Sequence, residues 1–195
     1  MTETLITPEK TCDGEERLLT AVEFAQLPVA GEGPCRELVR GVVILLPAPG
    51  FRHRFYQGNA YTVLWEYADN TRFGVVAADA TFQTNQEPDT VRGTDVAYWT
   101  VARLPLEPGP GSAPLEAPDL CVEVVSSAKK LNQARERMEE FLASGVRMVW
   151  IVEPEFHTVT VYRNPGEGRV LHTTAYVNGE DVLPGFQCSV ADFFS

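Results

Sequence analysis

The chain has 195 residues, of which 44% are apolar and 10% aromatic, so it is long enough to fold around one sizeable hydrophobic core. Its 16 basic and 27 acidic residues give a formal charge of −11, which argues against a general basic surface for binding phosphate backbones. No apolar run reaches the roughly 20 residues of a membrane span, and the polar, acidic N-terminus is unlike a secretory signal. We therefore expect a cytoplasmic protein that does not bind membranes.

The first part of the chain predicts a tail, a short helix and a hairpin. Residues 1–18 are polar and acidic and are expected to form a flexible N-terminal tail. In "TAVEFAQLP", Thr20 precedes Glu23 at the spacing of a capping box, which predicts the start of a helix. Residues 35–46, "CRELVRGVVILL", contain two apolar runs on either side of Gly41, and this pattern indicates a β-hairpin.

The middle of the chain predicts a longer helix, two strands and a loop. Apolar residues in 51–67 recur within one arc at 100° per residue, which predicts a helix, and His53 falls within the same arc. Strands are predicted at 73–84 and 94–101. The segment 104–118 is rich in proline and glycine, which is typical of a surface loop.

The clearest unit of secondary structure follows this loop. A buried strand is predicted at 120–125, a helix at 128–144 and a second strand at 148–152. This succession is typical of a crossover that joins two parallel strands. Strands at 158–163 and 170–177 and a closing turn complete the chain.

Glu123 lies inside the apolar run "LCVEVV", where an unpaired carboxylate would be costly to bury. Asp95 opens the preceding strand, so the two carboxylates converge if the strands are neighbours. Paired oxygen ligands suit Mg²⁺ or Mn²⁺, and such an ion activates water for phosphodiester hydrolysis. In the alternative interpretation, a buried Arg137 is the partner of Glu123, and the two form a purely structural ion pair.

Other polar residues also have two interpretations. Lys130 and Arg137 border the apolar stripe of their helix, where they either reach inward or extend their stems along the core with their charges in water. His53 fits a hydrogen-bonded core histidine and a phosphate or metal contact about equally well. Asp95 could simply satisfy a turn at the start of its strand, and Asp119 is interpreted as a turn residue.

Several segments occur in an order that resembles a known family. They are "TAVEFAQLP", "RELVRGVVILLP", His53, "DVAYWT", "PDLCVEVVSSA", "RERMEEFLASGVRMVWIVEPEFHTVTVYR" and "EDVLPGFQCSVADFF". From Thr20 to the C-terminus, this order resembles the Uma-two family, which belongs to the PD-(D/E)XK, or restriction-endonuclease-like, superfamily of nucleases. The spacing of "PDLxVEVxS" to a basic residue fourteen positions after its Glu is the most specific part of the resemblance.

The resemblance implies an α/β restriction-endonuclease-like core, in which a central mixed β-sheet is flanked by helices, with an N-terminal β-hairpin extension. It implies that Asp95 and Glu123 are the metal-binding acids, with a backbone carbonyl near Val124 completing the ligand set. Arg137 would stabilise the phosphate charge, and His53 would be a supporting contact. Residues 19–195 are expected to form a single domain.

Two positions depart from the family pattern. The superfamily has Lys two positions after the Glu, where this chain has Val125, and the basic group of Uma-type sequences, usually Lys on the following helix, is here Arg137. Arginine stays charged and cannot act as a general base, so water activation would depend on the metal. The second departure is Thr94, where the family usually has Pro.

The sequence therefore predicts a Mg²⁺-dependent or Mn²⁺-dependent endonuclease that acts on DNA and forms a homodimer. Basic residues around His53 and on the helix after Glu123 would offset the acidic surface locally. The alternative is a catalytically decayed nuclease fold that acts as a binding or dimerisation module, with Glu123 and Arg137 paired.

Overall fold

The computed structural model describes residues 4–5, 17–27, 35–104, 116–125 and 130–195. The chain forms two compact units, and each is considered by itself. The hairpin unit consists of residues 1–49, 81–93 and 105–116, and the sheet unit consists of residues 50–80, 94–104 and 117–195. Most of the predicted tail (1–18), most of the predicted loop (104–118) and residues 128–129 of the predicted helix lie outside the described residues. The expectation of one domain over 19–195 stays a prediction.

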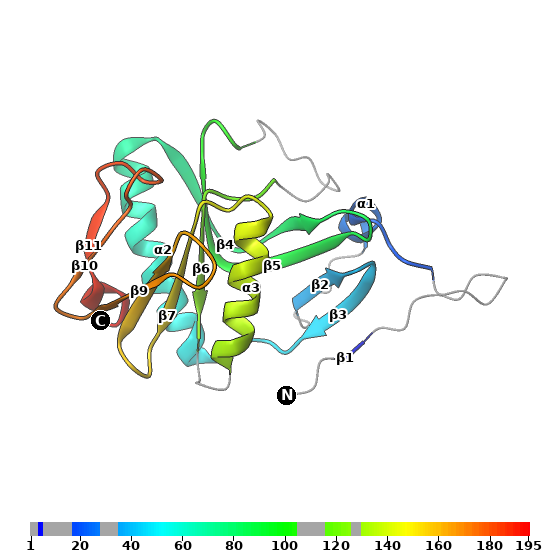
Figure 1. Ribbon diagram of the computed structural model, residues 1–195, viewed down its shortest axis with the longest axis horizontal. Helices are drawn as coiled ribbons and strands as arrows, with labels where there is room; N and C mark the ends of the chain where they lie inside the picture. The colour runs from blue at the N-terminus through cyan, green and yellow to red at the C-terminus, as the bar shows by residue number, and fades with distance from the viewer. Residues whose placement is uncertain (1–3, 6–16, 28–34, 105–115, 126–129) are drawn as a thin grey trace. The chain divides into compact units, whose positions relative to one another are not determined.

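The secondary structure follows in chain order (Figure 1). The helices are α1 (Ala21–Gln26), α2 (Phe51–Thr71), α3 (Leu131–Ala143) and the short 3-10 helix η2 (Val190–Phe193). The strands are β1 (Thr4–Leu5), β2 (Cys35–Val39), β3 (Val42–Leu46), β4 (Gly74–Asn85), β5 (Thr90–Thr100), β6 (Leu120–Val124), β7 (Met148–Glu153), β8 (Thr158–Tyr162), β9 (Gly168–His172), β10 (Tyr176–Asn178) and β11 (Gln187–Ser189). Within the described residues, no helix is long and apolar enough to cross a membrane.

The hairpin unit confirms the predicted β-hairpin and its turn. Strands β2 and β3 pair in antiparallel fashion up to Val39 and Val42. The two residues between them, Arg40 and Gly41, have φ angles of 51° and 77°. Two successive residues with positive φ form the kind of tight turn that matches the twist of a hairpin, and Gly is well suited to it because it has no Cβ.

The predicted short helix is also present in the hairpin unit. The Thr20 side chain accepts a hydrogen bond from the Glu23 N–H, and the Glu23 carboxylate accepts one from the Thr20 N–H, which completes the capping box. Ala21 then packs with Leu38 and Val91 in the small core of this unit. Capping and burial together explain why a helix of only six residues forms here.

The sheet unit contains a mixed sheet, as the sequence predicts. Strand β5 pairs with β4 and, in antiparallel fashion, with β6. Strand β6 pairs in parallel with β7, and β8 and β9 follow in antiparallel order. The parallel pair is connected through α3, which confirms the predicted strand, helix, strand unit. The mixed α/β architecture, with helices flanking the sheet, is therefore present.

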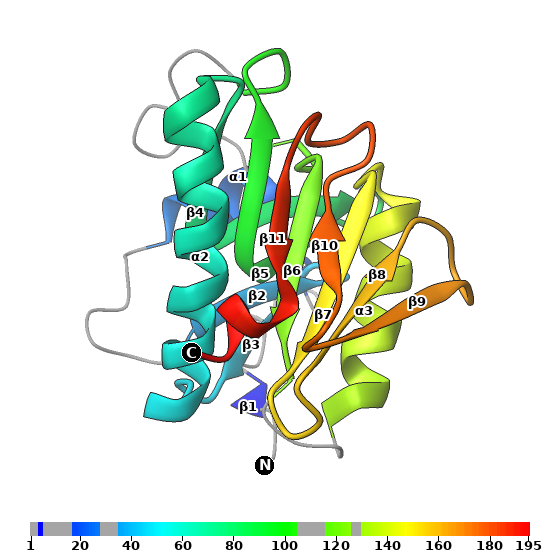
Figure 2. The ribbon, with the colours of Figure 1, turned by 90° about the vertical axis from the view of Figure 1, so that its left-hand side faces the viewer.

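The two faces of this sheet carry different layers (Figure 2). Helix α2, strands β10 and β11 and helix η2 cover one face, where alternate residues of β6, Leu120, Val122 and Val124, join the main hydrophobic cluster. Helix α3 lies behind the sheet in the same view. Because side chains alternate along a strand, Glu123 projects to the face opposite that of its two neighbours.

The C-terminal region differs from the sequence prediction. The strand predicted at 170–177 is interrupted, because Ala175 N–H donates to the His172 carbonyl in a turn and β10 leaves the main sheet. Strand β10 then pairs with β11, which the sequence did not indicate. The final segment forms helix η2, whose cap is the Ser189 side chain. A run of alternating apolar residues cannot reveal which partner strand each half will find.

Candidate active site

Asp95 and Glu123 lie on two neighbouring strands of the sheet unit, β5 and β6. Strands β5 and β6 are antiparallel, with Val96 opposite Val122 and Ala97 opposite Cys121. This pairing ends one position before Asp95 and Glu123. The Val124 N–H donates to the Asp95 carboxylate, so Asp95 lies beside the end of β6 that carries Glu123.

Two hydrogen bonds hold the Asp95 carboxylate. The His53 Nε2–H, from the first turn of α2, donates to Asp95 Oδ1 over 3.0 Å. The Val124 N–H, at the end of β6, donates to Asp95 Oδ2 over 2.6 Å. Only 20% of the Asp95 side chain and 14% of the His53 side chain are exposed. The carboxylate is therefore oriented by a helix and by the neighbouring strand, which limits its rotation.

Glu123 contacts Arg137 on helix α3. The Arg137 Nε–H donates to Glu123 Oε2 over 3.1 Å, and 11% of the Glu123 side chain is exposed. The guanidinium carbon of Arg137 also lies 5.4 Å from the centroid of the Phe141 ring. A charge-assisted bond of this kind offsets much of the cost of burying the carboxylate. The partner that the sequence proposed for Glu123 is therefore present.

The pKa of His53 is raised above its ordinary value. Burial is the largest influence and acts to lower it, but the hydrogen bond and the charge of Asp95, together with the charge of Glu123, outweigh burial and the opposing charge of Lys130. The His53–Asp95 pair thus stabilises the folded protein below the ordinary pKa of 6.5. That contribution is lost as the pH rises through the raised pKa.

Two further residues support this arrangement. The Gln57 side chain, in a residue that is only 4% exposed, donates from Nε2 to Asp79 Oδ1 over 2.9 Å and to the Asp95 carbonyl over 2.8 Å. Asp79 lies in β4 with a φ of 50°, which is unusual for a residue other than Gly, and its other oxygen pairs with Arg54 at 3.3 Å. Gln57 thereby connects the backbone of β5 to the irregular position in β4.

Sequence reasoning missed both residues, for different reasons. Gln57 lies four positions after His53, so the two share one face of α2, and this spacing is the signal that could have found it. Asp79 had no such signal. Its contribution depends on a positive φ angle within a strand, and the sequence does not show this angle. The residues that were named, Asp95, Glu123, Val124, Arg137 and His53, lie together in the sheet unit.

Replacing Gln57 with Ala should lower the free energy of unfolding by about 1–3 kcal/mol, because a buried donor with two acceptors is lost. Urea denaturation followed by circular dichroism would measure the change. Thr62→Ala is the matched control, since Thr62 is exposed on the same helix and bonds only within it. We expect the control to change stability by less than about 0.5 kcal/mol, and equal losses in both variants would contradict the bridging role.

The donor set suits a hard divalent cation. Asp95 and Glu123 offer carboxylate oxygens, and the three that accept hydrogen bonds from His53, the Val124 N–H and Arg137 each keep a second lone pair. The Val124 carbonyl lies on the same strand as Glu123. Across the described ranges, no group of three or more His, Cys, Asp or Glu side chains converges on one point. Mg²⁺ is commonly held by one or two carboxylates with water completing its shell, so two acids meet its requirement.

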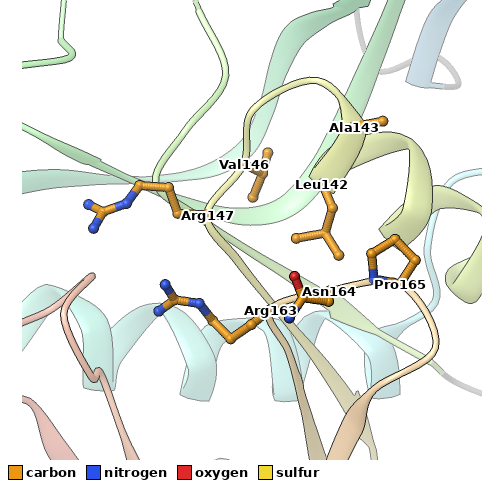
Figure 3. A pocket seen from close by; sticks show the side chains of 7 residues that line it. All are labelled: Leu142, Ala143, Val146, Arg147, Arg163, Asn164 and Pro165. Carbon is orange, nitrogen blue, oxygen red and sulfur yellow. The ribbon is translucent and has the colours of Figure 1, made fainter.

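A cavity of about 440 Å³ lies elsewhere in the sheet unit (Figure 3). It is lined by residues at the end of α3, just before β7 and just after β8, including Arg147 and Arg163. Both arginines form ion pairs with Asp181. Because Glu123 and Val124 lie at the other end of the parallel pair of β6 and β7, this cavity is separate from the carboxylate pair.

Comparison with solved structures shows the same fold in a nuclease-like protein. A crystal structure described as a putative nuclease belonging to DUF820 from Anabaena variabilis has a TM-score of 0.72 with this chain at 25% sequence identity. The match covers 90% of this chain and 97% of that one. The fold is therefore a restriction-endonuclease-like α/β fold.

The family follows from the sequence match. The family model described as "Uma2: Putative restriction endonuclease" matches residues 21–191, and the chain belongs to this family. No curated protein matches the chain. The resemblance noted from the sequence motifs is thus confirmed, and nuclease function at the level of the family is supported.

Proposed function

We propose that the protein is a divalent-metal-dependent endonuclease that hydrolyses phosphodiester bonds in DNA. The observation that carries the proposal is the pair of carboxylates on neighbouring strands, Asp95 and Glu123, each bonded to a basic side chain. This arrangement provides carboxylate oxygens that can bind a cation, and a fixed positive charge that can bind a phosphate. Membership of a family described as restriction endonucleases supports the same chemistry.

Asp95, Glu123 and the Val124 carbonyl would hold Mg²⁺ or Mn²⁺. When bound, such an ion acts as a Lewis acid on the phosphate and lowers the pKa of a coordinated water. The chain supplies the orientation: His53 and the Val124 N–H fix both oxygens of the Asp95 carboxylate. A ligand held in place before the reaction loses little conformational freedom on binding the ion.

Arg137 would stabilise the phosphate in the transition state. Its guanidinium remains protonated at any ordinary pH, and its contact with Glu123 places it beside the proposed metal ligands. A fixed positive charge that faces developing negative charge lowers the barrier to hydrolysis. Arg137 cannot remove a proton from water, so its role is electrostatic.

Local charge supports this proposal despite the acidic composition. Arg52 and Arg54 flank His53 on α2 and are exposed, and exposed Lys130 is close enough to influence the pKa of His53. Two arginines on the first turn of α2 and one lysine thus lie near His53 in a chain with a net charge of −11. A basic cleft can attract a phosphate backbone even when the rest of the surface is acidic.

A second candidate function is a non-catalytic binding or dimerisation module. The observation that favours it is the ion pair between Glu123 and Arg137, because such a pair satisfies both charges without any metal. A cytoplasmic location and a homodimeric state belong to both proposals. Light scattering coupled to size-exclusion chromatography would measure the oligomeric state.

Cleavage assays test the nuclease proposal directly. Supercoiled plasmid and single-stranded DNA would be incubated with Mg²⁺, with Mn²⁺ and with EDTA, using the wild type and a folded Asp95→Asn variant. We expect metal-dependent cleavage by the wild type and none by Asp95→Asn, which keeps the shape but not the charge of the ligand. Absence of cleavage on both substrates, or equal cleavage by the variant, would favour the binding module.

Arg137→Ala should reduce cleavage by roughly 10²–10³-fold, the usual effect of removing one group that stabilises a transition-state charge. Arg137→Lys should retain or increase cleavage, because Lys restores a positive charge at a position where the family usually has it. Single-turnover cleavage rates for the two variants would measure the difference. If Arg137→Ala cleaves at the wild-type rate, the guanidinium has no role in the reaction.

A further inference from the structure

Two phenylalanines in the first two turns of α2, the helix that also carries His53, project into solvent. Phe51 is 87% exposed and Phe55 is 44% exposed. Because they are four positions apart, they lie on the same side of the helix. Neighbouring apolar rings left in water are unfavourable unless something binds them, and patches of this kind commonly mark binding sites.

Basic side chains alternate with these rings. Arg52 and Arg54 are exposed, and the first turn of α2 contains no acidic residue. The Arg52 guanidinium lies over the Tyr56 ring, 5.9 Å from its centroid. The Arg54 side chain, half exposed, pairs with the similarly exposed Asp79. Exposed rings with adjacent arginines are complementary to a ligand that has both flat apolar faces and negative charges.

Edge-on ring contacts continue from Phe55 through Tyr56 and Phe194, which are partly buried against the core. Phe55 contacts Tyr56 with ring centroids 5.3 Å apart, Tyr56 contacts Phe194 at 6.0 Å, and Phe194 contacts His157 at 5.2 Å. His157 lies in the turn between β7 and β8. Since β6 and β7 are parallel, this turn lies at the same end of the sheet as Val124.

The exposed rings lie within one helical turn of the candidate active site. His53, which bonds Asp95, is two positions from Phe51 and two from Phe55. The three residues lie within one turn of α2, or about 5.4 Å along its axis, but two positions correspond to about 200° around it, so both rings face away from His53. A single strand that binds the rings would therefore pass over the N-terminal end of α2 to reach the carboxylate pair.

We propose that Phe51 and Phe55, with Arg52 and Arg54, form a subsite for unpaired nucleobases, and that the preferred substrate is single-stranded nucleic acid. The rings stack on the bases while the arginines contact the phosphates, a combination that binds single strands with little dependence on sequence. In an intact duplex the base faces are stacked on one another and are not available. The cleavage part of this inference rests on the nuclease function proposed above.

Binding measured without metal separates this subsite from catalysis. Fluorescence anisotropy, measured in EDTA, would compare the affinity of the protein for a labelled oligodeoxythymidine with its affinity for a labelled duplex. The variants are Phe51→Ala, Phe55→Ala and Phe51→Trp, which keeps a stacking ring. Phe73→Ala is the matched control, because Phe73 is 55% exposed but follows the far end of α2, a helix of 21 residues or roughly 30 Å.

We expect the wild type to bind the single strand more tightly than the duplex, and each Ala variant to lose at least about fivefold in affinity for it. Phe51→Trp and Phe73→Ala should bind as the wild type does. Equal affinity for both nucleic acids, or unchanged affinity in Phe51→Ala and Phe55→Ala, would overturn the subsite even if the protein cleaves duplex DNA. Ring-dependent binding by a protein that cleaves neither substrate would uphold the subsite and reject the nuclease.

Discussion

Replacing Glu123 with Gln is expected to abolish both DNA cleavage and the rise in melting temperature that we expect Mn²⁺ to produce in the wild type. A ligand that binds only the folded state stabilises it by about 2.7 kcal/mol at 100 times its dissociation constant. For a chain of this size, that gain corresponds to a shift of roughly 5 to 10 °C. The Glu123→Gln variant would keep a side-chain oxygen for Arg137 but would lose the negative charge that binds the cation. Differential scanning fluorimetry with and without Mn²⁺ measures the shift.

Two further variants distinguish a metal site from a structural ion pair. Glu153→Gln, at the end of β7, removes a partly buried carboxylate of the same unit and should leave the Mn²⁺ shift intact. Glu123→Ala leaves Arg137 without this acceptor and should lower stability with or without metal. If Mn²⁺ raises the melting temperatures of the wild type and of Glu123→Gln equally, the cation binds elsewhere. That result would favour the interpretation of Glu123 and Arg137 as a structural pair.

Replacing Asp119 with Ala should cost about 3 kcal/mol of folding free energy, because a buried carboxylate with several partners is lost. Asp119 is 1% exposed, its Oδ2 accepts the Thr100 N–H over 2.8 Å, and its Oδ1 lies 3.3 Å from Arg147 Nη1 and 3.6 Å from Arg103 Nε. Both arginines are about one-third exposed and can rehydrate, which keeps the loss below that of a fully buried pair. Urea denaturation measures it.

Asp181→Ala is the control for this prediction. Asp181 also pairs with Arg147, at 2.7 Å, and with Arg163, at 2.6 Å, but 63% of its side chain is exposed. Water replaces the partners of an exposed carboxylate readily, so we expect a much smaller loss of stability. Similar losses in the two variants would show that burial of Asp119 is not what makes it important.

The element pattern was largely predictable because it depends on local sequence. The capping box at Thr20, the turn at Gly41 and the parallel pair around α3 each follow from residues close together in the chain. The split between β9 and β10 was not predictable in this way. Partner choice there depends on β11, a strand of three residues whose composition alone gives no strong signal.

The candidate site was predictable where burial conflicts with charge. Glu123 within an apolar run required a partner, and the structure places Arg137 there. Asp119 was interpreted as a turn residue, and it does lie in a bend just before β6, yet its side chain is buried beneath two arginines. A carboxylate at a strand boundary gives no sequence signal of burial, because its partners lie far away in the chain.

The hydrogen bonds of the proposed active site also constrain when that site can be complete during synthesis of the chain. His53 meets Asp95 across 42 residues of sequence, Asp95 meets Val124 across 29, and Glu123 meets Arg137 across 14. A growing chain that has not yet emerged past α3 therefore lacks one member of the cluster, whatever its earlier elements have already formed. Asp95 and Glu123 are synthesised before Arg137. A ribosome-bound fragment that ends before Arg137 therefore carries the proposed metal ligands without the charge that would stabilise a phosphate.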